Sequence, residues 1–166
     1  MNIFKNPRAG NFAGFLACVG MMACALFFQY GMDLEPCPLC VLQRVGTIAL
    51  GLAFLIAAIH NPAGWGRGVY VMLVPIVGLA AAAVSARHVW LQNLPKDQVP
   101  ACGPDLSFML DTFPLFEVLS TVLSGSGECA DISWQFLGLS MPAWTLILLG
   151  ALSAWALWVN VPGRRV

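Results

Sequence analysis

Residues 9–32 read AGNFAGFLACVGMMACALFFQYGM, a run of 24 residues without a charged side chain between Arg8 and Asp33. Three further stretches are equally free of charge, with 22, 19 and 32 residues respectively: 45–66, 68–86 and 132–163. About 20 apolar residues are enough for a helix to span a bilayer. The sequence therefore predicts four membrane-spanning helices, at about 12–30, 41–59, 69–90 and 143–160.

The composition of the whole chain is typical of a membrane protein. Of its 166 residues, 59% are hydrophobic and only 10% are charged, and the mean hydropathy is +0.79, whereas about 25% of the residues of a soluble domain are charged. Eight basic residues balance eight acidic ones, so there is no basic excess to neutralise nucleic-acid phosphates. We predict an all-α membrane protein in which residues 1–166 form a single integral membrane domain, and we expect no nucleic-acid partner.

The distribution of charge predicts the orientation of the chain. With four spans, both termini and the connection between the second and third spans lie on one side of the membrane. That side carries five basic residues and no acid: Lys5, Arg8, Arg67, Arg164 and Arg165. Cytoplasmic segments are enriched in Lys and Arg. We therefore expect both termini in the cytoplasm, and the connections at about 31–40 and 91–142, which carry all eight acids, on the opposite face.

The connection at 91–142 is long, and long loops are usually functional. Within it, apolar residues recur at helical spacing between 115 and 123, with Glu117, Ser120 and Thr121 between them. This pattern predicts a short helix. Two placements are open: the helix lies in the membrane interface with its apolar face toward lipid, or it packs on the end of the bundle.

The six cysteines fall into two groups. Cys18 and Cys24 lie inside the first predicted span, where a free cysteine behaves as a small buried hydrophobe. The other four lie on the extracytoplasmic side: Cys37, Cys40, Cys102 and Cys129. An even number of cysteines in an oxidising compartment indicates disulfides. A structural bridge in the long loop is one interpretation, and thiol–disulfide exchange between two cysteine pairs is the other.

Cys37-Pro38-Leu39-Cys40 is a C-x-x-C motif directly before the second predicted span. A disulfide across only two residues closes a small loop and exchanges readily. Metal binding is the usual alternative, but a single C-x-x-C without a second pair at zinc-like spacing, and without a nearby histidine, is weak evidence for a metal. We therefore expect redox chemistry at this motif and no metal ligand.

Two polar side chains lie close to the C-x-x-C motif in predicted depth. Arg44 follows Cys40 by four residues on the same helix face, and Cys40 lies at a helix N-terminus, where the helix dipole favours an anion. A charged residue inside a span marks a functional site, although snorkelling to the interface is an alternative explanation. His88, at the end of the third predicted span, has a similar depth, so we expect Arg44 and His88 to border one pocket between helices.

The pattern of these segments resembles the bacterial disulfide bond formation protein B (DsbB) family over essentially the whole chain. The matching segments are Pro36-Cys37-Pro38-Leu39-Cys40 with Gln43-Arg44, Arg87-His88 with Leu91-Gln92, Cys102, and Gly127-Glu128-Cys129-Ala130 followed by WQFLGLSMPAW at 134–144. The resemblance implies a four-helix transmembrane bundle in the bacterial inner membrane, with a long periplasmic loop that contains a short interfacial helix.

The resemblance also implies an activity. It predicts a thiol oxidase that reoxidises a soluble, periplasmic, thioredoxin-like partner of the DsbA type and delivers two electrons to a membrane quinone. Carried over by position, Cys102 is attacked by the reduced partner, and Cys129 is the mate of Cys102. Cys37 then accepts the electrons from this loop pair, and Cys40 faces the quinone.

The same resemblance predicts the quinone site. Arg44 is expected to stabilise the Cys40 thiolate and the quinone ring, and His88 and Gln92 are expected to line the same pocket. The quinone is ubiquinone or menaquinone. Two other functions are open on the residues alone: a four-span scaffold with structural disulfides, and an enzyme of the vitamin K epoxide reductase type, in which the redox motif lies late in the chain rather than at the second span.

Overall fold

The computed structural model describes residues 6–62, 65–95, 97–100 and 106–161. Within these ranges, four helices are long and apolar enough to cross a membrane: α1 (Pro7–Gly31), α2 (Pro38–His60), α3 (Trp65–Gln92) and α7 (Met141–Asn160). The prediction of a four-helix membrane bundle is thereby confirmed. Each helix contains its predicted span and extends beyond it by a few residues.

The helix ends explain the extra length. Proline is favoured in the first turn of a helix, because it has no backbone N–H to leave unpaired. Pro7 opens α1 after Asn6, whose side chain accepts a hydrogen bond from the backbone N–H of Arg8 at 3.1 Å. Pro38 opens α2 directly after Cys37. Each of these two helices therefore begins at its proline, directly after the capping residue and a few residues before the predicted span.

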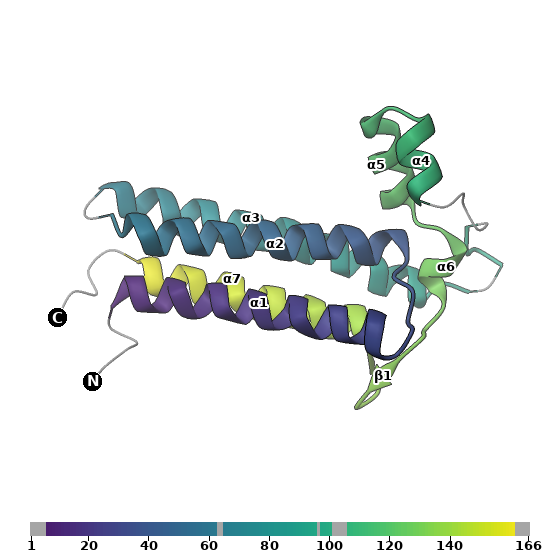
Figure 1. Cartoon of the computed structure of the whole chain (residues 1–166), viewed down its shortest axis with the longest axis horizontal. Helices are drawn as coiled ribbons and strands as arrows, with labels where there is room; N and C mark the ends of the chain where they lie inside the picture. Colours follow the sequence, from purple (N-terminus) through teal and green to yellow (C-terminus); the bar gives the residue numbers. More distant parts are fainter. Residues whose placement is uncertain (1–5, 63–64, 96, 101–105, 162–166) are drawn as a thin grey trace.

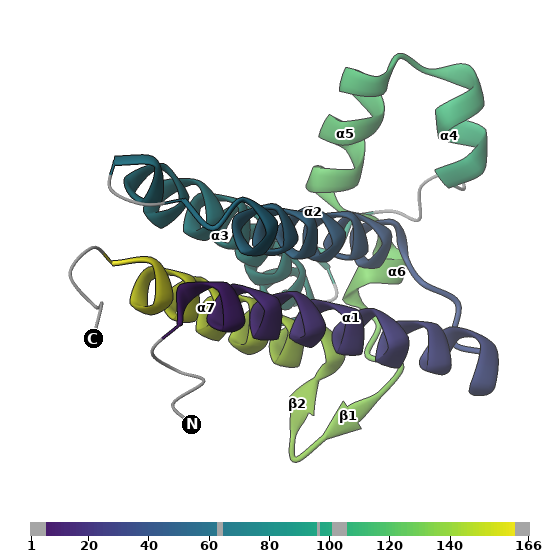
Figure 2. The ribbon, with the colours of Figure 1, turned by 60° about the vertical axis from the view of Figure 1, so that its left-hand side comes forward.

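The four long helices form an antiparallel bundle in which α1 packs against α2, α2 against α3, α3 against α7 and α7 against α1 (Figures 1 and 2). The start of α1 and the end of α7 lie at the same end of the bundle as the turn between α2 and α3 (Figure 1). The opposite end carries the long connection between α3 and α7. This is the arrangement that four consecutive spans with short and long connections predict.

Small residues let these helices approach closely, as is common between helices in membranes. The central core contains Leu50, Phe54, Val74 and Leu149, all with no exposed surface. A methyl group on Gly14 of α1 would lie 2.7 Å from Phe54 Cε1 of α2. The ring of Phe54 therefore occupies the space that any larger residue at Gly14 would need.

We expect Gly14→Ala to destabilise the bundle by about 1–3 kcal/mol, because the added methyl group overpacks this contact. Gly20→Ala is the matched control on the same helix, since nothing lies within 4 Å of a methyl group at Gly20. Thermal unfolding in detergent, followed by circular dichroism, measures both variants. Equal melting temperatures for the two variants would contradict the predicted packing of Gly14 on Phe54.

The connection between α3 and α7 is mostly structured. It contains α4 (Leu106–Thr112), α5 (Leu115–Ser124), the single turn α6 (Gly127–Ala130) and a hairpin of β1 (Gln135–Phe136) and β2 (Leu139–Ser140). The strands pair antiparallel, and Leu137 and Gly138 at their turn both have positive φ, 52° and 76°. Two such residues are typical of the two-residue turns that join hairpin strands. The predictions from the sequence did not include α4, α6 or the hairpin.

The predicted helix at 115–123 is confirmed as α5. Val118 and Val122 on one side of α5 are buried in a second apolar cluster, together with Leu39 of α2 and Leu91 of α3. The other side is exposed and apolar, and Phe116 there is 84% exposed. One side of α5 thus packs on the end of the bundle, while the other has the apolar surface that an interfacial helix needs. The position of α5 in the membrane interface stays a prediction.

Candidate active site

The C-x-x-C motif forms the first turn of α2. Cys37 is the N-terminal cap of the helix, and its Sγ accepts a hydrogen bond from the backbone N–H of Cys40 at 3.4 Å. The two sulfur atoms lie 3.2 Å apart as free thiols. The prolines at 36 and 38 restrict the backbone on both sides of Cys37. The local sequence thus brings both sulfurs to one helix end, at a separation that a small side-chain rotation closes into a disulfide.

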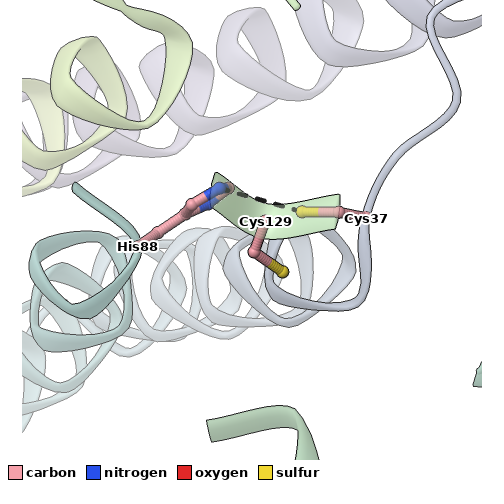
Figure 3. Close-up of side chains that lie close together, drawn as sticks. All are labelled: Cys37, His88 and Cys129. Carbon is pink, nitrogen blue, oxygen red and sulfur yellow. Dashed lines mark hydrogen bonds between the residues drawn. The ribbon is translucent and has the colours of Figure 1, made fainter. Parts of the chain in front are cut away.

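A third cysteine joins this pair from the long connection. The turn α6 places Cys129 in the second apolar cluster with no exposed surface. Cys37 Sγ, Cys129 Sγ and a ring nitrogen of His88 all lie within 4.8 Å of one another (Figure 3). Residues 37, 88 and 129 are far apart in sequence, so the fold creates this cluster. Cys102, the fourth predicted site cysteine, lies outside the described residues.

His88 is held between a glutamine and a cysteine. Only 2% of its surface is exposed. Its Nδ1 lies 2.9 Å from Nε2 of Gln43 on α2, and its Nε2 lies 3.8 Å from Cys37 Sγ. If the Gln43 amide donates to Nδ1, the ring carries its proton on Nε2, toward Cys37. The buried histidine therefore presents Nε2 toward the sulfur at the helix cap.

Cys129 is electrostatically distinct from an ordinary surface cysteine. A hydrogen bond with the Cys37 side chain and burial raise the pKa of the Cys129 thiol far above its usual range. The thiolate is the nucleophile in disulfide exchange. A free Cys129 therefore stays protonated until a neighbouring group accepts its proton, and the His88 ring nitrogen is within 4.8 Å.

A cavity of about 940 Å³ opens beside the cysteines. Residues from all four long helices contribute to its wall, which includes both cysteines of the C-x-x-C motif. The polar side chains at the wall include Gln43, Arg44, His88 and Gln92, and its apolar side chains include Met21, Phe28, Trp144 and Leu148. Ligand sites of this size are typically apolar with a few well-placed polar groups.

Arg44 is fixed at this cavity by α1. Its guanidinium donates hydrogen bonds to the side-chain oxygen of Gln29 and, at 3.2 Å, to the backbone oxygen of Ala25. Arg44 thus lies among helix–helix contacts at the cavity wall, with its charge held at one place. Both hydrogen-bond partners of Arg44 belong to the neighbouring helix α1.

Comparison with known proteins decides the family. The family model described as "Disulfide bond formation protein DsbB" matches residues 7–159 of the chain. The chain belongs to this family. A disulfide bond formation protein B of Nitrosococcus oceani is 55% identical over 147 residues, which cover 87% of each chain. One of Hahella chejuensis is 52% identical over 164 residues, covering 98% of this chain and 99% of its own.

Membership of the DsbB family confirms the resemblance and the oxidoreductase class predicted from the sequence. It decides against the vitamin K epoxide reductase type and against a scaffold without enzymatic activity. The match covers all four long helices and the connection that carries Cys129. The cluster at Cys37 is therefore part of a family fold whose named role is disulfide formation.

The structure places most of the predicted site residues together. Cys37, Cys40, Arg44, His88 and Gln92 all line the cavity. A histidine does lie near the C-x-x-C motif, contrary to the expectation from the sequence, because helix packing brings His88 to Cys37.

Two glutamines that were not predicted complete the site. Gln43 orients His88, and Gln29 anchors Arg44. The available signal was their polarity, because a buried amide inside an apolar span needs a hydrogen-bond partner and marks a functional position.

The two cysteines of α1 differ from each other. Cys18 is buried in the central core, as predicted. Cys24 is exposed on the helix and contributes to the cavity wall. The expectation that Cys24 is a buried hydrophobe is therefore wrong, because its side of α1 faces the cavity and not the core of the bundle.

Proposed function

We propose that this chain is a protein-dithiol:quinone oxidoreductase of the bacterial inner membrane. It reoxidises a periplasmic, thioredoxin-like partner of the DsbA type and passes two electrons to ubiquinone or menaquinone in the cavity. The observation that carries the proposal is the position of Cys129, whose sulfur lies within 4.8 Å of Cys37 Sγ beside that cavity. One sulfur of the loop is thus in reach of the C-x-x-C motif.

The first half of the reaction opens both disulfides. A thiolate of the reduced partner attacks Cys102 Sγ and breaks a bond between Cys102 and Cys129, so Cys129 leaves with the electron pair. The Cys129 thiolate then attacks Cys37 Sγ and breaks the Cys37–Cys40 bond. Cys40 is released as a thiolate at the cavity wall.

The second half returns the loop to its starting state. The second thiol of the partner displaces Cys102 and leaves as part of the partner's new disulfide. Cys102 then attacks Cys129 Sγ, which restores the loop disulfide and releases Cys37. Two electrons now reside on Cys37 and Cys40, and re-forming their disulfide transfers two electrons and two protons to the quinone.

The neighbouring side chains support this sequence of steps. A hydrogen bond and burial raise the pKa of the Cys129 thiol. A nearby group must therefore accept its proton before the thiolate attacks Cys37. His88, oriented by Gln43, holds or releases a proton between Cys37 and Cys129. The position of Cys40 in the first turn of α2 favours its thiolate, because the N-terminal end of a helix stabilises negative charge.

The cavity suits a quinone in size and composition. Its volume of about 940 Å³ accepts a substituted ring with part of its isoprenoid chain. Apolar side chains offer a surface for the chain, while Arg44 and Gln92 offer hydrogen-bond donors to ring carbonyls. A quinone supplies a two-electron, two-proton acceptor that is soluble in the bilayer.

We expect Arg44→Ala to raise the KM for quinone about tenfold or more, equivalent to about 1.4 kcal/mol of lost binding free energy. Arg87→Ala is the matched control. Arg87 lies at the same end of the bundle but donates to the backbone oxygens of Leu123 and Ser124 and stacks over Trp90. Turnover measured against quinone concentration distinguishes the variants. An unchanged quinone KM in Arg44→Ala would refute the assigned role.

The charge distribution supports the orientation of this relay. Among the described residues, Arg8 and Arg67 lie at the bundle end with the α2–α3 turn, and the acids lie at the end with α6. The positive end faces the cytoplasm. The cysteine cluster then faces the periplasm, where the partner is found, and the whole chain acts as one membrane domain.

Quinone-dependent oxidation of a reduced thioredoxin-like periplasmic protein tests the proposed function. The purified full-length chain in detergent is mixed with the reduced partner and a short-chain quinone, and quinone absorbance is followed. Catalytic quinone reduction with one partner disulfide formed per quinone supports the proposal. Stable bridging of the extracytoplasmic cysteines with no quinone reduction would contradict the proposal.

A further inference from the structure

The reduced cysteine cluster has the composition of a metal site. Cys37, Cys129 and His88 offer two sulfurs and one imidazole nitrogen within 4.8 Å of one another. Cys40 adds a third sulfur, 3.2 Å from that of Cys37. Three cysteines and one histidine are among the common ligand sets of tetrahedral zinc sites. Residues from α2, α3 and α6 contribute, so the set exists only in the folded chain.

We infer that the fully reduced chain binds one thiophilic divalent cation of the Zn²⁺ class through Cys37, Cys129 and His88, with Cys40 as the fourth ligand. The bound form is inactive, because the cation occupies the sulfurs that electron transfer uses. Oxidised chain does not bind the cation, since a disulfide sulfur is a poor ligand compared with a thiolate. No oxidant or reductant is consumed, and binding releases only the thiol protons.

The observed distances are close to those of a tetrahedral site. Zinc bonds of about 2.3 Å to sulfur and about 2.0–2.1 Å to nitrogen place a sulfur and a nitrogen ligand about 3.6 Å apart, and two sulfurs about 3.8 Å apart. Cys37 Sγ and His88 Nε2 are 3.8 Å apart. The Cys37 and Cys40 sulfurs, at 3.2 Å, separate slightly on binding. The ligand atoms of Cys37, Cys129 and His88 lie within 4.8 Å of one another, so side-chain rotations that draw them closer complete the coordination shell.

The surroundings of the cluster suit a bound cation. Ligating histidines commonly hydrogen-bond a second group through the other ring nitrogen, and Gln43 already holds His88 Nδ1 at 2.9 Å. When Nε2 binds the cation, Nδ1 carries the proton and donates to the Gln43 amide oxygen, which rotation of the amide presents. Cys129 has no exposed surface and His88 is only 2% exposed, as in closed zinc sites.

Cobalt is the probe that tests this inference, because Co²⁺ reports tetrahedral thiolate coordination in its visible and near-ultraviolet spectrum. The full-length chain is reduced in detergent, freed of quinone and titrated with Co²⁺, then with Zn²⁺. We expect one Co²⁺ per chain with a sulfur-to-metal charge-transfer band that Zn²⁺ removes. The absence of such a band, or an equal band in the oxidised chain, would overturn the inference.

Variants separate this site from binding to the C-x-x-C motif alone. We expect His88→Ala and Cys129→Ser each to weaken Co²⁺ affinity at least about 100-fold, and Gln43→Leu to weaken it about 10–100-fold. Cys24→Ser is the matched control, because Cys24 lies at the cavity wall outside the ligand set. Circular dichroism verifies folding of each variant. Unchanged affinity in folded Cys129→Ser would assign the cation to Cys37 and Cys40 alone and refute the site.

The inactivity of the bound form rests on the proposed function and has its own measurement. Reduced chain is incubated with Zn²⁺ before quinone is added, and oxidised chain is treated in parallel. We expect a loss of quinone reduction that a chelator reverses, in the reduced sample only. If the chain lacks quinone reductase activity altogether, the cobalt titration still tests the site, so failure of the two proposals is distinguishable.

Discussion

Replacing Cys40 by serine is expected to lower quinone reduction by at least about 1,000-fold, the scale seen when an essential nucleophile is removed. Cys40 lines the cavity and, in the proposed relay, leaves as a thiolate when Cys129 attacks Cys37. Serine keeps the size and the helix turn but cannot form a disulfide with Cys37. Electrons that reach Cys37 then have no route to the quinone.

Quinone absorbance with the reduced partner as electron donor measures this effect. Cys18→Ala provides the control, since it removes another cysteine of the bundle that lies in the central core and does not line the cavity. We expect the control to turn over at the rate of the unaltered chain. Substantial quinone reduction by Cys40→Ser would mean that Cys37 or a loop cysteine passes electrons directly, and the assignment of Cys40 would be wrong.

Cys129→Ser is expected to separate the two halves of the relay. The variant lacks the loop disulfide that the partner attacks and the sulfur that reaches Cys37, so quinone reduction driven by the partner falls about 1,000-fold. A small dithiol such as dithiothreitol reaches Cys37 directly, because Cys37 is only partly buried. Dithiothreitol-driven quinone reduction is therefore retained.

The comparison of the two electron donors in one assay makes this test specific. In Cys40→Ser, both the partner and dithiothreitol fail, while in Cys129→Ser only the partner fails. A general loss of folding lowers both activities together, so the selective loss identifies a break between loop and motif. Equal losses with both donors in a folded Cys129→Ser would contradict the proposed order of transfer.

The membrane-spanning helices could be predicted because the bilayer limits what they contain. A charged residue within a span is costly, so the uncharged stretch at 9–32 alone is close to the observed α1. The C-x-x-C motif was recognisable because both cysteines are neighbours in sequence. Arg44 was recognisable because it is a charge inside an apolar helix.

The cluster around His88 could not be predicted from the residues in the same way. Its contacts with Gln43 and Cys37 join positions 45 and 51 residues apart, and they depend on how α3 rotates against α2. Cys129 reaches Cys37 through the single turn α6, which is too short to show a periodic pattern. The hairpin strands have two residues each, so alternation could not reveal them either.

In the proposed relay, electrons pass from the loop to the C-x-x-C motif through a bond between Cys129 and Cys37. The double variant Cys40→Ser/Cys102→Ser leaves these two as the extracytoplasmic cysteines. Mild oxidation in membranes, followed by alkylation of free thiols and mass spectrometry of the peptides, shows whether they join. The matched variant Cys40→Ser/Cys129→Ser leaves Cys37 with Cys102 instead. We predict a Cys37–Cys129 disulfide in most molecules of the first variant and little cross-linking in the second. Free Cys37 and Cys129 in the first variant, together with efficient Cys37–Cys102 bonding in the second variant, would contradict the proposed relay.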